Sequence, residues 1–84
     1  MSKKDKLLER FLLLPKDFTW DEAIRLLNFF GYRELKTGKT GGSRRKFINQ
    51  KKHIISLHKP HPGNILKHYQ LEILMTALKE EENI

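Results

Sequence analysis

The stretch "RRKFINQKKHIISLH", residues 44–58, decides the fold of this chain. It holds two short runs that alternate apolar and polar residues, 44–49 and 53–58, and a polar segment, 50–52, between them. Short alternating runs separated by a brief polar segment are typical of antiparallel strands joined by a tight turn. We therefore expect a β-hairpin here.

Side chains alternate between the two faces of a strand, so the hairpin has a calculable register. If Phe47 points to the core, the register that also buries the apolar residues of the second strand pairs Phe47 with Ile55. The same register pairs Arg44 with His58, and directly opposed residues have Cβ atoms about 5 Å apart. We therefore expect a guanidinium and an imidazole to share one patch of the face that points away from the core. The expected outward set is Arg44, Lys46, Ile48, Ile54, Ser56 and His58.

Helical patterns flank the hairpin on both sides. Residues 3–14 carry apolar residues at helical spacing up to a proline, which stops a helix. Thr19 and Glu22 have the spacing of a capping box at the start of a second helix, and Gly31 is suited to end it. From about residue 67 the helical period returns. These apolar stripes indicate core positions.

The order of elements is therefore helix, helix, three strands and helix, with residues 32–36 as a short edge strand. This order predicts a small α+β domain, a three-stranded antiparallel sheet with helices on one face. Residues 1–84 form a single domain in this interpretation, with 1–15 as an extra N-terminal helix and 19–78 as the core. Arg45 turns inward near the end of the sheet, and we expect its charged head to extend back toward solvent.

The positive charge is concentrated in one segment of the chain. The formal net charge is +7, yet residues 33–68 hold ten Lys or Arg against one acid, giving +9, and the remaining residues sum to −2. All four histidines lie in the same segment. A local block of cations gains affinity for a polyanion by releasing counterions, so nucleic acid is the leading partner class. The ordinary alternative is a solvated basic surface.

Membrane partners are disfavoured by the pattern of the basic segment, which Gly and Pro interrupt and which forms no amphipathic helix. The chain has no Cys, and its longest apolar run, residues 11–14, is too short for a membrane span or a signal sequence. We therefore expect a soluble, cytoplasmic protein with no membrane contact.

Histidine and arginine side by side suit RNA cleavage without a metal. This reaction needs a base that takes the 2′-hydroxyl proton and a cation that stabilises the phosphorane oxygens. A two-metal nuclease needs clustered carboxylates, and Glu34 is the one acid in the basic segment. Zinc is disfavoured because no Cys is present and because His53 and His58 bracket a strand in opposite directions. We therefore expect no metal at this site.

Three stretches of the sequence are distinctive in their order and spacing: "FFGY" at 29–32, "GKTGGSRRKF" at 38–47 and "HIISLHKPHPGNILKHYQLEILMTAL" at 53–78. Together they resemble the HicA toxin family of bacterial toxin–antitoxin pairs. The resemblance implies a fold like the double-stranded-RNA-binding domain and a ribosome-independent mRNA endonuclease that needs no cofactor. It also implies a HicB-type antitoxin that covers the RNA-facing surface. By this interpretation the chain contacts mRNA and not DNA on its own, and it acts in a stress response.

The resemblance also indicates where the site residues lie. The family usually has a catalytic His just after the Gly-Ser of its second strand, and this sequence has Arg44 there, followed by Arg45. We therefore expect the base to be His58 or His61. His58 is favoured because it faces Arg44, whereas His61 matches the His-Pro-Gly of the family and would hold substrate or act as a second acid or base. The expected RNA-binding residues are Lys39, Ser43, Arg45, Lys46, Lys51 and Lys59.

Three functions are open at this point. The first is an endoribonuclease toxin in which Arg44 assists the base. The second is an RNA-binding module that does not cut its RNA. The third is an interaction domain whose basic face binds an acidic protein, since an antitoxin would use that same surface. RNA binding and RNA cleavage would distinguish the three.

Overall fold

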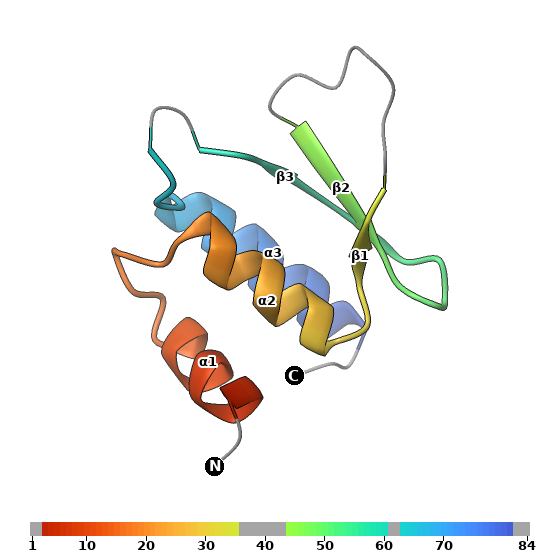
Figure 1. Cartoon of the computed structure of the whole chain (residues 1–84), viewed down its shortest axis with the longest axis horizontal. Helices are drawn as coiled ribbons and strands as arrows, with labels where there is room; N and C mark the ends of the chain where they lie inside the picture. Colours follow the sequence, from red (N-terminus) through yellow and green to blue (C-terminus); the bar gives the residue numbers. More distant parts are fainter. Residues whose placement is uncertain (1–2, 36–43, 61–62, 82–84) are drawn as a thin grey trace.

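The computed structural model describes residues 3–35, 44–60 and 63–81, and Figure 1 shows its arrangement. Three helices and a three-stranded antiparallel sheet confirm the expected α+β fold. The helices are α1 (Lys3–Leu12), α2 (Trp20–Phe29) and α3 (His68–Glu80), and the strands are β1 (Arg33–Glu34), β2 (Arg44–Ile48) and β3 (Ile54–His58).

The strand order is β1-β2-β3, with β2 in the centre. The register of β2 and β3 is the predicted one, since it pairs Phe47 with Ile55 and Arg44 with His58. Of the predicted strand at 32–36, the described residues 32–35 form a strand only at Arg33–Glu34, and Lys36 lies outside the described residues. Gly31 has φ +86° and the amide of Tyr32 donates to the carbonyl of Leu27 at 2.9 Å, so Tyr32 completes the end of α2 instead of starting the strand.

The core lies between the sheet and two helices, α2 and α3, which cover the same face (Figure 1). The rings of Trp20 on α2 and Phe47 on β2 have centroids 5.9 Å apart. In β3 the inward residues are buried and the outward residues exposed, in strict alternation. This burial holds the strand register, because a shift of one residue would expose the whole apolar set. The fully enclosed members of the core include Phe11, Phe18, Leu26, Leu27, Phe47, Leu74 and Leu78.

α1 ends at Leu12, two residues earlier than predicted. Leu14 has φ +49°, so the chain has already left the helix before Pro15. A residue that precedes proline is pushed away from helical geometry, and this moves the end of the helix back.

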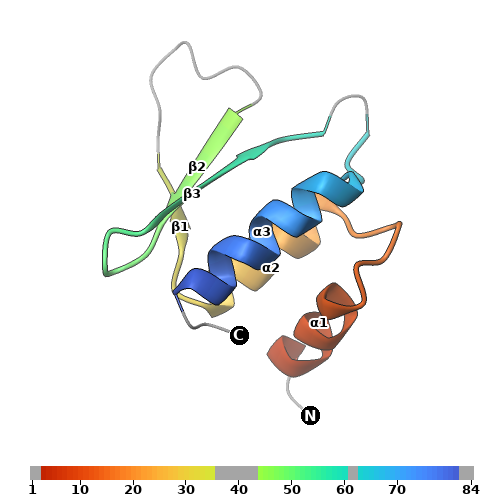
Figure 2. The ribbon, with the colours of Figure 1, turned by 180° about the vertical axis from the view of Figure 1, so that it is seen from behind.

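α1 packs against α2 on the side away from the sheet (Figure 2). Arg10 joins the two helices, because its guanidinium contacts Glu22 at 2.7 Å and Asp17 at 2.9 Å. The rings of Phe11 and Phe18 lie beside this ion pair with centroids 5.5 Å apart. α1 is therefore an integral third layer of the described fold.

Glu22 also completes the predicted capping box, since its carboxylate accepts from the Thr19 amide at 3.0 Å while the Thr19 hydroxyl accepts from the Glu22 amide at 3.1 Å. The hydrogen bond from Arg10 lowers the pKa of Glu22, burial opposes this effect, and the Thr19 amide lowers the pKa further. A carboxylate whose pKa is lowered by folding stabilises the folded state at neutral pH. That stabilisation disappears as the pH falls through the folded-state pKa.

We therefore predict that Glu22→Gln lowers the urea midpoint of unfolding at pH 7, because Gln keeps the shape but loses the charge. The difference from the wild type should shrink as the pH falls through the lowered pKa of Glu22, because below it the carboxyl is protonated in both states. Glu9→Gln, at an exposed position of α1, is the control and should behave like the wild type throughout. A deficit of Glu22→Gln that stays constant throughout an acid titration of the folded protein would contradict this account.

Candidate nucleic-acid interface

The face of the sheet that points away from α2 and α3 is not covered by any described element. Ile54 is 50% exposed on this face although it is apolar, and Ile48 opposite it is half-buried. Lys46 and Ser56 are paired across the strands and are both exposed. The predicted outward set therefore does line an accessible surface, which we call the open sheet face.

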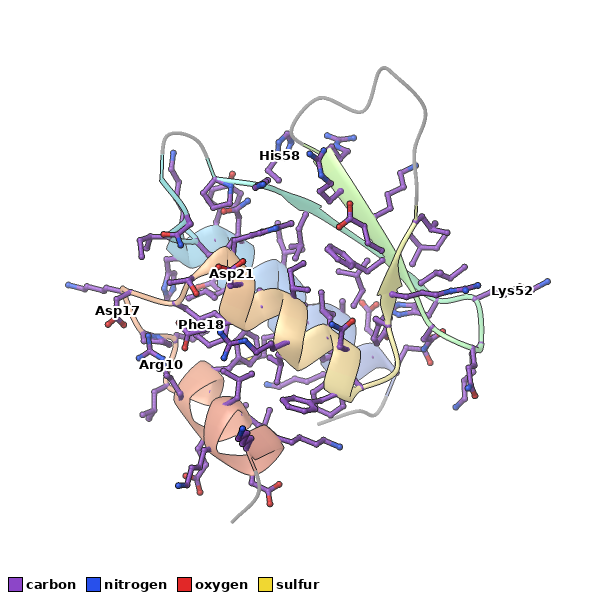
Figure 3. All side chains as sticks on the ribbon, viewed as in Figure 1. Arg10, Asp17, Phe18, Asp21, Lys52 and His58 are labelled. Carbon is purple, nitrogen blue, oxygen red and sulfur yellow. The ribbon has the colours of Figure 1, made fainter. Side chains whose placement is uncertain are left out.

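Arg44 and His58 lie directly opposite each other at one end of this face, and both are exposed. Figure 3 shows His58 at the end of β3, away from the helices. Opposed residues of antiparallel strands have Cβ atoms about 5 Å apart, so one phosphate group can contact both side chains. Lys59 follows His58 and is exposed. Lys46 lies two residues after Arg44 on β2, and the Cα atoms of these two residues are about 7 Å apart. Three cationic residues are therefore close neighbours of His58 in the strand register or in the chain.

Arg45 is the inward member of this pair of arginines, as predicted. Its side chain is 30% exposed, and its Nε lies 3.5 Å from a carboxylate oxygen of Glu34 on β1. Its guanidinium also donates to the carbonyl of Arg44 at 3.3 Å. Arg45 therefore reaches the edge of the sheet at β1, while Arg44 alone of the two stands on the open sheet face.

The other predicted RNA contacts fall into two groups. Lys51 is exposed in the turn between β2 and β3, at the opposite end of the hairpin from His58. Figure 3 shows the distance between the two ends of the hairpin, with Lys52, the neighbour of Lys51, at one end and His58 at the other. An RNA strand would have to run along the whole hairpin to contact both ends. The remaining candidates, Lys39, Ser43 and His61, lie outside the described residues.

The histidines occupy different environments, which separates their roles. The ring of His53 is 20% exposed, and its Nδ1 lies 2.8 Å from the Tyr32 hydroxyl and 3.8 Å from a carboxylate oxygen of Glu81. His53 therefore holds the turn end of the hairpin to the segments that follow α2 and α3. His68 lies on α3 and contacts Glu72 of the next turn at 2.6 Å. Of the three described histidines, His58 alone stands on the open sheet face beside an arginine.

Gln70 is a residue that sequence reasoning missed. It is a polar side chain only 3% exposed, on the first turn of α3. Its amide nitrogen donates to the backbone carbonyl of His58 at 2.5 Å, and its amide oxygen accepts from the Lys67 amide at 3.3 Å. Gln70 therefore ties the last residue of β3 to the start of α3 and fixes the backbone from which the His58 ring projects. A polar residue within an apolar helical stripe was the signal for this role.

Within residues 3–35, 44–60 and 63–81, no group of three or more His, Cys, Asp or Glu side chains is placed to bind a metal ion. No helix in this part of the chain has the length and apolar character needed to cross a membrane.

These features define a class of protein, a small α+β domain that presents a basic, histidine-bearing sheet face and covers the other face with helices. The model of the family described as HicA toxin of bacterial toxin-antitoxin matches residues 20–79. The chain belongs to this family and is a toxin of a toxin–antitoxin system, so its partner is an antitoxin. No curated protein and no solved structure matches the chain. The family match begins at α2, so α1 lies outside it.

We predict that Gln70→Leu reduces the free energy of unfolding by about 1–3 kcal/mol, because the His58 carbonyl and the Lys67 amide both lose a partner. Urea denaturation measures this loss. Gln50→Leu, the same change at an exposed turn position, is the control and should stay within about 0.5 kcal/mol of the wild type. Equal stability of Gln70→Leu and the wild type would show that the contact between β3 and α3 does not depend on this side chain.

Proposed function

We propose that this toxin is a metal-independent endoribonuclease that cuts mRNA at the open sheet face, with His58 as general base and Arg44 as the phosphate-stabilising cation. The observation that carries the proposal is the direct pairing of Arg44 with His58 on an exposed face. Membership of the toxin family supports it, as does the concentration of positive charge in residues 33–68.

The reaction uses the RNA's own hydroxyl as the nucleophile. The imidazole of His58 takes the proton of a 2′-hydroxyl, the 2′-oxygen attacks the adjacent phosphorus, and the bond from phosphorus to the 5′-oxygen breaks. The guanidinium of Arg44 faces the phosphate oxygens, whose negative charge grows in the transition state. A proton from His61 or from water neutralises the departing 5′-oxygen. The products carry a 2′,3′-cyclic phosphate and a 5′-hydroxyl.

The arrangement explains how the chain can do without a histidine at the usual family position. Arg44 stands where the family resemblance places the catalytic His on the second strand. His58 is the cross-strand neighbour of that position, so its imidazole reaches the same patch from β3. In this proposal the base has moved from the second strand to the third, while the site keeps its place on the sheet.

The same surface suits control by the antitoxin. A HicB-like antitoxin that covers the open sheet face would remove RNA from Arg44 and His58 by direct competition. Such a partner would carry acidic groups, because complementary charge speeds association and sets the register of an interface. This proposal places the toxin in the cytoplasm, where both mRNA and the antitoxin are made.

We predict that the purified protein cleaves single-stranded RNA in the presence of EDTA. His58→Ala should lower the cleavage rate by about 10²–10⁴-fold, the usual contribution of a general base. Arg44→Lys should retain binding and lose rate, because lysine keeps the charge but not the planar fork. His68→Ala is the matched control, since His68 is an exposed histidine on α3, which packs against the covered face of the sheet. Gel analysis of end-labelled RNA measures the cleavage rates of the wild type and the three variants.

Full cleavage by His58→Ala would overturn the assignment of the base, and His61→Ala is then the variant that tests the second candidate. A requirement for a divalent metal would overturn the mechanism. Binding that is salt-sensitive but never followed by cleavage would instead favour the non-catalytic RNA-binding module, which the presence of Arg44 at the usual histidine position leaves as the second candidate.

A further inference from the structure

A groove runs between α1 and α2, on the side of the molecule away from the open sheet face. Its volume is about 290 Å³, and its lining combines two apolar side chains with four cations. Phe29 is 41% exposed there, an unusual position for a large aromatic ring that has no covering element among the described residues. The lining residues are Lys3, Lys6, Leu7, Arg10, Arg25 and Phe29.

Three basic residues of α1 line this groove, and its acidic residues do not. Lys3, Lys6, Leu7 and Arg10 are spaced at 0, 3, 4 and 7 and so share one face of the helix. The acids of α1, Asp5 and Glu9, lie on another flank and do not line the groove. α2 contributes Arg25 and Phe29, one turn apart, to the opposite wall. The groove therefore has an apolar floor and a positively charged rim.

The rim charges differ in how far they are already neutralised. Arg10 pairs with Asp17 and Glu22, so its charge is largely compensated within the fold. Lys3, Lys6 and Arg25 are exposed, and they give the rim its positive sign. Such a groove is complementary to a ligand that buries an apolar side chain in it and places carboxylates against its positive rim.

We propose that the groove between α1 and α2 is a second docking site for the antitoxin, which inserts an acidic amphipathic segment there. The occupant is taken to be the antitoxin because the family match gives an antitoxin as the partner, and the positive rim of the groove is complementary to an acidic segment. A peptide with large apolar residues at helical spacing would seat them on Leu7 and Phe29. Its carboxylates would lie against Lys3, Lys6 and Arg25.

This arrangement has a functional consequence. α1 and the sheet lie on opposite sides of α2 (Figure 2). The groove between α1 and α2 is therefore on a different side of the molecule from the open sheet face. An antitoxin anchored in the groove would remain attached to the toxin while the part of it that covers the open sheet face dissociates and binds again. Two sites joined in one partner raise the effective concentration at the second site, so the toxin is recaptured quickly.

The test uses the full chain and a fluorescein-labelled peptide with leucines at positions i, i+4 and i+7 and glutamates between them. We expect the peptide to bind and Lys6→Glu/Arg25→Glu to weaken binding by about tenfold or more at about 0.15 M salt, where screening limits the effect of a charge to its neighbourhood. The matched control is Arg44→Glu/Lys46→Glu, which changes the net charge equally on the open sheet face and should alter the affinity by less than about twofold. Phe29→Ala should also weaken binding, because it removes half of the apolar floor. Circular dichroism checks that each variant is folded.

Several results would overturn the proposal. Equal losses in the two double variants would mean that the peptide responds to net charge alone. Equal affinity for a peptide with lysines in place of the glutamates would remove the electrostatic argument. Displacement of the acidic peptide by excess single-stranded RNA would identify the groove as an RNA site. None of these readouts depends on RNA cleavage, so they are independent of whether the protein is a nuclease.

Discussion

The pairing of Phe47 with Ile55 is the constraint on which the rest of the structure depends. Both residues are almost completely buried, and together with Leu57 they hold β2 and β3 against α2 and α3. Because side chains alternate along a strand, this one pairing also determines that Arg44 and His58 meet on the opposite face. A shift of one residue would bury charge and expose the core, so the same apolar contacts that stabilise the fold also set the geometry of the candidate site.

Much of this could be predicted from the sequence because the hairpin pattern is strict. Apolar residues every second position fixed the register, and Thr19 with Glu22 fixed the start of α2. The residues that escaped prediction depend on tertiary contacts. Tyr32 looked like a strand residue but belongs to the end of α2, and Leu14 leaves the helix before Pro15.

The same alternation also predicted which side chains of the candidate site share a face of the sheet. Alternation along the strands placed Arg44 beside His58 and turned Arg45 inward, as observed. Alternation carries no information on how the end of β3 is held, and that information lies in the contacts of Gln70 with His58 and Lys67. It also cannot bring distant segments together, so the groove between α1 and α2 became visible only in the folded chain.

The positive charge is thus divided between two sides of one small domain. One side is the open sheet face, which we propose binds RNA, and the other is a cation-rimmed groove between α2 and α1, a helix that the family match does not include. The most direct measurement of the central claim is a titration of the ¹⁵N-labelled protein with 2′-O-methyl RNA, which binds but cannot attack its own phosphate. We expect the largest amide shifts at Arg44, Lys46, Ser56 and His58, and little change at Tyr69 and Ile73 on the outer side of α3. Shifts concentrated on the helices, with the open sheet face undisturbed, would contradict the account.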